Sequence, residues 1–181
     1  LPMLGLGGSV GTPPEGITAD VLVVSGFDDL KKRSEEAKGK IVLFNVPFTE
    51  YRETVIVRTQ GASHAARAGA VASLIRSVGP FSMQTPHTGN MSYVSGVKKI
   101  PHAAISLEDA NMLTRMASRG ESIRVRLKMD AKMLTDGISR NVIAEIPGRE
   151  KPEEIVIVSG HIDSWDVGQG AMDDGGGCLA A

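Results

Sequence analysis

The chain has 181 residues, of which 41% are hydrophobic, and its 20 basic and 21 acidic side chains leave a net charge of -1. This balance gives no overall field for nucleic acid or an anionic membrane surface, and no apolar run approaches the roughly 20 residues of a membrane span. The single cysteine, Cys178, excludes an internal disulfide framework and a thiolate-rich zinc cage within the chain. Because an initiator Met is missing and the last residues are an apolar run, we expect a fragment of a longer protein.

Glycine and proline dominate the first part of the chain. Residues 1–17 contain five glycines and the pair Pro13-Pro14, a composition typical of a loop or linker. From residue 18 onward, short strands alternate with short helices. Strands are expected at residues 21–25, 41–45 and 123–127, helices at 28–38, 60–67 and after Ser106, and an apolar run at 70–75. This alternation predicts a compact α/β or α+β module.

The composition changes twice more along the chain. Residues 80–101 are rich in Ser, Gly, Thr and Asn, which predicts a long surface excursion. A domain boundary is expected near Thr135. Beyond it, residues 142–146 and 155–159 have the composition of two strands joined by a charged loop, and an antiparallel pair is the simplest interpretation.

Polar side chains follow the second of these strands. The β-branched run at residues 155–158 predicts a strand buried on both faces, and ligands bind beyond the carboxyl ends of such strands in open α/β sheets. The next residues include one histidine and four aspartates: His161, Asp163, Asp166, Asp173 and Asp174. Imidazole and carboxylate ligands suit a hydrolytic metal such as zinc, and a shared carboxylate commonly bridges a metal pair.

Other interpretations of the same segment are less favourable. An isolated His-x-Asp would usually be a solvated turn, but such a turn does not need Trp165, Val167 and the three glycines at 175–177. A serine hydrolase is disfavoured because neither Ser159 nor Ser164 lies in a Gly-x-Ser-x-Gly elbow. The basic residues between 115 and 128 alternate with apolar ones and indicate a solvated strand face.

The segments 159–166 (SGHIDSWD) and 170–177 (GAMDDGGG) together resemble the co-catalytic dizinc exopeptidase family, which includes secreted aminopeptidases and glutamate carboxypeptidases. Further matching segments extend the resemblance to nearly the whole chain: residues 1–18, 74–77, 86–89 and 116–118. The resemblance implies an α/β fold, with a partial zinc exopeptidase domain of mixed sheet and an inserted protease-associated-type α/β domain. Residues 1–17 would be a linker or segment of the catalytic domain, 18–134 the insert, and 135–181 the truncated start of the catalytic domain.

The resemblance also implies roles for individual residues. His161 would bind one Zn²⁺ and Asp173 would bridge the two Zn²⁺ ions of the active site, while Asp163 would orient the liganding histidine, a positioning role that tunes metal affinity. The general-base Glu and the remaining ligands of the family are missing, and we expect the three other histidines to be structural or on the surface: His64, His87 and His102. We therefore expect the fragment alone to be inactive and to fold badly at its C-terminal end.

The implied function is that of a zinc-dependent exopeptidase of the metallocarboxypeptidase or dipeptidase type, which hydrolyses dipeptides or short peptides through a zinc-activated water. The alternative is a non-catalytic protein-interaction module formed by residues 18–134. A sequon at Asn90 is a predicted glycosylation site and is consistent with the secreted, extracellular or lysosomal location that the resemblance implies. The resemblance further implies a homodimer, and neither nucleic acid nor a membrane span is expected.

Overall fold

The computed structural model describes all 181 residues. The chain divides into two compact units, Leu1–Leu134 and Thr135–Ala181, which are described separately. No helix in the chain combines the length and apolar character needed to cross a bilayer.

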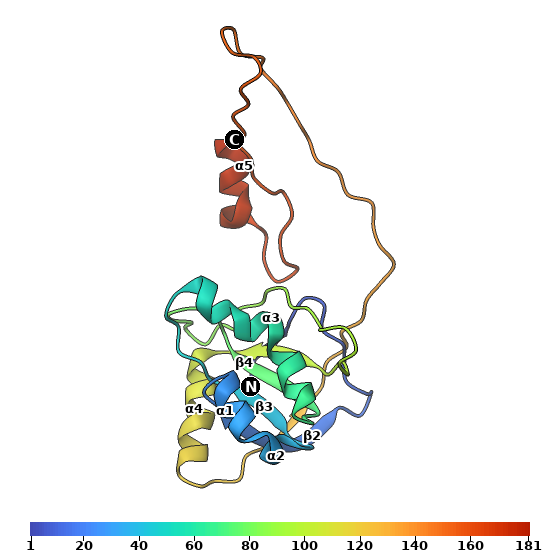
Figure 1. The fold of residues 1–181 in the computed structure, drawn as a ribbon, viewed down its shortest axis with the longest axis vertical. Coiled ribbons are helices and arrows are strands. Elements are labelled where there is room, and N and C mark those ends of the chain that lie inside the picture. The colour runs from blue at the N-terminus through green and yellow to red at the C-terminus, as the bar shows by residue number, and fades with distance from the viewer. The chain divides into compact units, whose positions relative to one another are not determined.

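A six-stranded mixed sheet forms the centre of the first unit, with strand order β1-β5-β4-β3-β2-β6 (Figure 1). The strands are β1 (Met3–Gly5), β2 (Ile17–Val24), β3 (Ile41–Phe44), β4 (Ala72–Arg76), β5 (His102–Ile105) and β6 (Arg124–Leu127). Strands β2, β3, β4 and β5 are parallel, whereas β1 and β6 pair antiparallel with β5 and β2. The predicted α/β class is therefore confirmed.

Helices cover both faces of this sheet. They are α1 (Phe27–Lys32), α2 (Ser34–Ala37), α3 (Tyr51–Arg67) and α4 (Leu107–Ser118). Leu30 of α1 and Val57 of α3 belong to one core cluster, together with Phe44 of the sheet. Leu113 of α4 belongs to the cluster on the opposite face, which includes Leu43. The result is a three-layer arrangement with α4 alone on one side.

Strand β3 shows why the sequence forms this centre. All four of its residues are buried, and alternate side chains enter opposite core clusters. An unbroken apolar run suits a strand covered on both faces, because every side chain leaves water whichever way it points. The predicted strand at residues 41–45 is confirmed.

The helices differ in part from their predicted limits. The expected helix at 28–38 is two short helices, since the backbone bends at Arg33, whose guanidinium Nη1 donates to Val23 O at 2.9 Å. The expected helix at 60–67 begins nine residues earlier at Tyr51, because charged and β-branched residues in its first half obscure the apolar periodicity. Ser106 caps α4 as expected, since its Oγ accepts a hydrogen bond from Asp109 N at 3.1 Å.

The first residues are not entirely loop. Met3–Gly5 is an edge strand whose residues pair with Ala103–Ile105 of β5. This pairing depends on a partner almost a hundred residues away, so local composition could not indicate it. The assignment of residues 1–17 to a catalytic domain stays a prediction.

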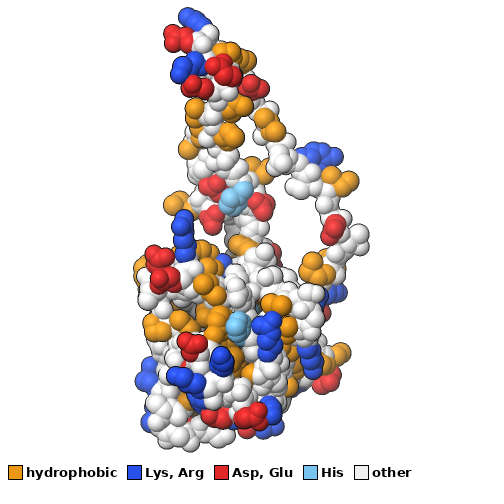
Figure 2. Space-filling view, viewed as in Figure 1, with side chains coloured by type: hydrophobic (Ala, Val, Ile, Leu, Met, Phe, Trp, Pro, Cys, Tyr) orange, Lys and Arg blue, Asp and Glu red, His pale blue; other side chains and the backbone are white.

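The second unit contains an irregular helical turn, η1 (Ala171–Gly175), and the short helix α5 (Gly176–Ala180). The strand pair predicted at residues 142–146 and 155–159 is wrong for this structure, because neither segment forms a strand. The two segments still line one shared hollow of about 470 Å³. Their apolar side chains are on the surface (Figure 2), with Ile146 95% and Val156 88% exposed. Two strands without a third strand or a helix against one face are only marginally stable.

Candidate metal centre

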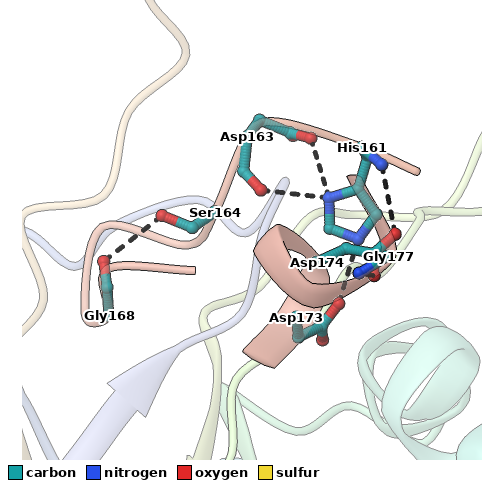
Figure 3. Close-up of polar contacts among 7 residues, drawn as sticks. All are labelled: His161, Asp163, Ser164, Gly168, Asp173, Asp174 and Gly177. Atoms are coloured by element: carbon teal, nitrogen blue, oxygen red, sulfur yellow. Dashed lines mark hydrogen bonds and ion pairs between the residues drawn. The ribbon is translucent and has the colours of Figure 1, made fainter. Parts of the chain in front are cut away.

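Two loops of the second unit meet around His161. The backbone N of His161 donates to Asp174 Oδ2 at 3.2 Å, and Gly177 N donates to Asp174 Oδ1 at 3.0 Å (Figure 3). The Asp174 carboxylate therefore joins the loop after residue 159 to the start of α5.

Glycines allow the close approach of these loops. A Cβ added to Gly160 would lie 2.6 Å from Cys178 N and 2.7 Å from Gly177 C, both of them backbone atoms. A Cβ added to Gly177 would overlap the Asp174 carboxylate. Backbone cannot move aside as a flexible side chain can, so any side chain at Gly160 would separate the two loops.

Carboxylates bracket the His161 imidazole on both sides (Figure 3). Its Nδ1 lies 3.0 Å from Asp163 O and 3.1 Å from Asp163 Oδ1, while its Nε2 lies 2.9 Å from Asp173 Oδ1. The Asp163 carbonyl, followed by the Asp173 carboxylate, raises the pKa of His161 above its usual value. The structure thus brings together the three residues that the sequence singled out.

The side chains at this site are of the types that bind zinc, but there are fewer of them than a hydrolytic zinc site usually has. The 2.9 Å separation of His161 Nε2 and Asp173 Oδ1 is that of a hydrogen bond, for which Nε2 carries a proton. A zinc ion would replace this proton while Asp163 holds the other proton on Nδ1, and nitrogen and oxygen are both zinc ligands. Hydrolytic zinc sites usually have three protein ligands, and the chain contains no group of three or more His, Cys, Asp or Glu side chains placed to hold a metal. His161 and Asp173 are therefore two candidate ligands without a third. Their roles as metal ligands stay predictions.

The neighbouring residues have structural contacts. Ser164 Oγ donates to Gly168 O at 3.2 Å, and Gly168 N donates to Trp165 O at 3.0 Å, so a tight turn separates Asp163 from Asp173. Trp165 is 46% exposed. No hydrogen bond or ion pair of the Asp166 side chain is formed within the chain, so the structure assigns Asp166 no role.

The remaining histidines belong to the first unit. The His64 ring stacks on Phe27, with a centroid distance of 3.9 Å, and burial lowers its pKa. His87 lies in the exposed loop after β4, as expected. His102 is a structural histidine, since it is the fully buried first residue of β5 and its Nδ1 lies 2.7 Å from Ser73 Oγ. Asn90 is exposed and forms an isolated parallel β-bridge with Gly7.

Two protein families match successive parts of the chain. Residues 11–113 match the PA domain, and residues 141–181 match Peptidase family M28. The first match lies within the three-layer unit. The second contains His161, Asp163, Asp173 and Asp174, which together form the His161 cluster.

Curated relatives match almost the whole chain. It is 60% identical over 98% of its length to Carboxypeptidase Q of Homo sapiens and 62% identical over 99% to Carboxypeptidase Q of Xenopus laevis, and it spans only 38% of the length of each. A probable leucine aminopeptidase 2 of Aspergillus oryzae is 30% identical over 93% of the chain, which spans 32% of that relative.

A solved structure agrees with these matches. The crystal structure of a Peptidase M28 precursor from Shewanella amazonensis is similar, with a TM-score of 0.88 and 37% identity over 96% of this chain and 41% of that one. The chain therefore belongs to the PA domain family, whose model covers residues 11–113, and its residues 141–181 are similar to Peptidase family M28.

Proposed function

We propose that this chain is part of a zinc-dependent exopeptidase of the metallocarboxypeptidase or dipeptidase type. The observation that carries the proposal is the His161 Nε2 to Asp173 Oδ1 pair at 2.9 Å, with Asp163 behind the ring at Nδ1. The similarity to Carboxypeptidase Q supports peptides or dipeptides as substrates. Since the chain spans 38% of those relatives, the activity is proposed for a protein of their length.

Each residue of the cluster has a defined task in this proposal. Asp163 would hold the proton on His161 Nδ1, which would leave Nε2 as the metal donor when zinc binds and fix the orientation of the ring. Asp173 lies on the other side of the ring, and the resemblance implies that its carboxylate would be shared by the two Zn²⁺ ions. Bound zinc lowers the pKa of a coordinated water from about 15.7 to about 7, which supplies a nucleophile at neutral pH. The general-base Glu and further ligands would come from outside the His161 cluster.

Zinc titration of the 181-residue chain tests the ligand roles. We expect weak binding that is lost in His161→Ala and Asp173→Ala, and no dipeptide hydrolysis, because a two-ligand site holds zinc poorly. His87→Ala removes an exposed histidine of the first unit and is the matched control. Micromolar zinc affinity together with turnover by this chain would refute the inactivity that we propose for it.

The same substitutions have a second use in a protein of the relatives' length. There, His161→Ala should abolish hydrolysis of a dipeptide, whereas His87→Ala should not change it. Undiminished turnover by the His161→Ala protein, at saturating and at limiting zinc, would rule out His161 as a ligand.

A protein-interaction role is the second candidate. It is favoured by the three-layer unit, which has two core clusters of its own and matches the PA domain. This candidate predicts that residues 1–134 bind a partner without zinc. Retention of binding after chelation with EDTA distinguishes it from the peptidase.

We further propose that the protein enters the secretory pathway, for an extracellular or lysosomal location, and carries a glycan on Asn90. The exposure of Asn90 and the sequon with Ser92 support this. Expression with a secretion signal should give a mass that falls on deglycosylation, and Asn90→Gln should remove that difference. Homodimer formation by the longer protein is proposed from the resemblance alone, and sedimentation equilibrium tests it.

A further inference from the structure

A hollow lies between α1 and the C-terminal end of α3 in the first unit, and we call it the α1–α3 hollow. The two helices are side by side there (Figure 1), and the hollow has a volume of about 380 Å³. This volume is within the roughly 300 to 1,000 Å³ of pockets that bind small molecules. Lys31 and Arg67, which line it, are exposed. The hollow is therefore a single surface that a ligand can reach from solvent.

Two stacked aromatic rings line the α1–α3 hollow. The His64 ring is nearly parallel to the Phe27 ring, with a centroid distance of 3.9 Å and an interplanar angle of 8°. Phe27 also meets Phe44 of the core edge-on, at a centroid distance of 5.5 Å, so the stacked pair is fixed to the core. Both Phe27 and His64 are only half-buried. A flat apolar group that enters the hollow can pack against these rings.

Two cations without counter-ions line the same hollow. Lys31 of α1 and Arg67 of α3 form no side-chain hydrogen bond or ion pair within the chain. Asp28 is the one acidic residue of the lining, so positive charge is in excess. Burial and, less strongly, the charge of Arg67 lower the pKa of His64, so its imidazole is neutral at pH 7. Charge complementarity therefore favours an anion in the hollow.

A cation is the competing occupant, because the negative end of the α3 dipole also lies at the hollow. The carbonyls of residues 64–66 are already engaged, however, since they accept hydrogen bonds from the amides of residues 68–70. Asp28 comes three residues before Lys31 on α1, a spacing that places both on one face of the helix, so Lys31 offsets its charge. The charge of Arg67 remains without compensation, and this decides for an anion.

We propose that the α1–α3 hollow binds a small aromatic anion. The ring of the ligand packs against Phe27 and His64. Its anionic group, a carboxylate or a phosphate, is held by Lys31 and Arg67, since lysine and arginine bind both kinds of group. An aromatic ring is favoured over an aliphatic chain because side-chain cations are attracted to ring faces as well. The site belongs to the first unit, so it does not rest on the zinc chemistry proposed for His161.

NMR titration of the 181-residue chain tests the proposal with four probes of similar size: phenylacetate, phenyl phosphate, the neutral phenylacetamide and the cationic phenethylammonium. We expect saturable shifts of the His64 ring protons and the Leu30 methyl groups with both anions, since these side chains line the hollow. The other two probes should bind at least about fivefold more weakly. The anion that binds more tightly identifies the preferred anionic group. No saturable shift with either anion, or equal or tighter binding of the amide or the ammonium, would overturn the proposal.

Three charge variants separate recognition from net charge. Arg67→Gln and Lys31→Gln should each weaken phenylacetate binding by about three- to fivefold, the effect of one exposed ion pair. Arg115→Gln is the matched control, because Arg115 is an exposed arginine without an ion pair on α4, which packs on the other face of the sheet. It should leave the affinity unchanged. Equal weakening in all three variants would reduce the effect to net charge and overturn the assignment of the anion.

The pKa of His64, followed by its ring-proton shifts, shows where the anion binds. A bound anion counters the charge of Arg67, so saturating phenylacetate should raise the pKa of His64. The charged groups that line the hollow with the imidazole are Asp28 and Lys31 from α1 and Arg67 from α3. Arg67→Gln should therefore raise the pKa of His64 in the free protein and reduce the further rise on binding. An unchanged His64 pKa at saturating phenylacetate would place the anion elsewhere and overturn the proposal.

Discussion

His102 should make the first unit sensitive to acid. The imidazole is fully buried, and burial lowers its pKa to about 4 from the usual 6.5. Its Nδ1 is bound to Ser73 Oγ, whereas its Nε2 has no hydrogen-bond partner of normal geometry, and the nearby carbonyls of Val57 and Arg58 oppose the pKa decrease only in part. The neutral form is therefore the one that the fold accommodates.

The sign and size of the effect follow from proton linkage. Below pH 6.5 the unfolded chain binds a proton at His102 that the folded chain does not bind until about pH 4. Stability is thus fully present above pH 6.5 and falls as the pH decreases toward 4. The difference in pKa corresponds to roughly 3 kcal/mol of unfolding free energy.

Urea unfolding followed by circular dichroism between pH 7 and pH 4 measures this loss. Carboxylates also titrate in this range, so the relevant quantity is the difference between wild type and His102→Gln. The variant should be less stable at pH 7, because it disturbs the Ser73 contact, but should lose less stability on acidification. His87→Gln, at an exposed position, should behave as wild type. Equal pH dependence in wild type and His102→Gln would refute the reasoning.

Three further changes have clear expected outcomes. Ser106→Ala should lower the unfolding free energy by about 1 kcal/mol by removing the cap on Asp109 N, measured against the exposed control Ser118→Ala. Gly61→Ala should destabilise by about 1 to 3 kcal/mol despite its better helix propensity, since the new Cβ would lie 3.1 Å from the His102 ring; a stabilised variant would show that the ring can move. Residues 1–134 alone should keep the melting temperature of the chain and bind less of the dye ANS, because the exposed apolar side chains at 142–158 are removed; equal dye binding would contradict this.

Local signals in the sequence were sufficient for much of the fold. The buried run at 41–44, the cap at Ser106 and the glycines after α3 and α4 act within a few residues, so β3, the start of α4 and the ends of both helices lie close to where they were expected, whereas α3 begins nine residues earlier. The His161 cluster was also predictable, because the separation of His161, Asp163 and Asp173 is bridged by one short loop.

Partners distant in the sequence determined the rest. By itself the sequence predicted an α/β chain with His161 and Asp173 as metal ligands and Asp163 as the residue that orients the histidine, and these roles stay predictions. The tertiary structure decided that Met3–Gly5 pairs with β5, that His102 is buried at the centre of the unit and that Arg76 is left without a counter-ion. It also decided against the strands at 142–146 and 155–159. A β-strand is stable only where neighbouring strands and a covering layer complete its hydrogen bonds and bury its side chains, and no local pattern encodes whether that cover is present.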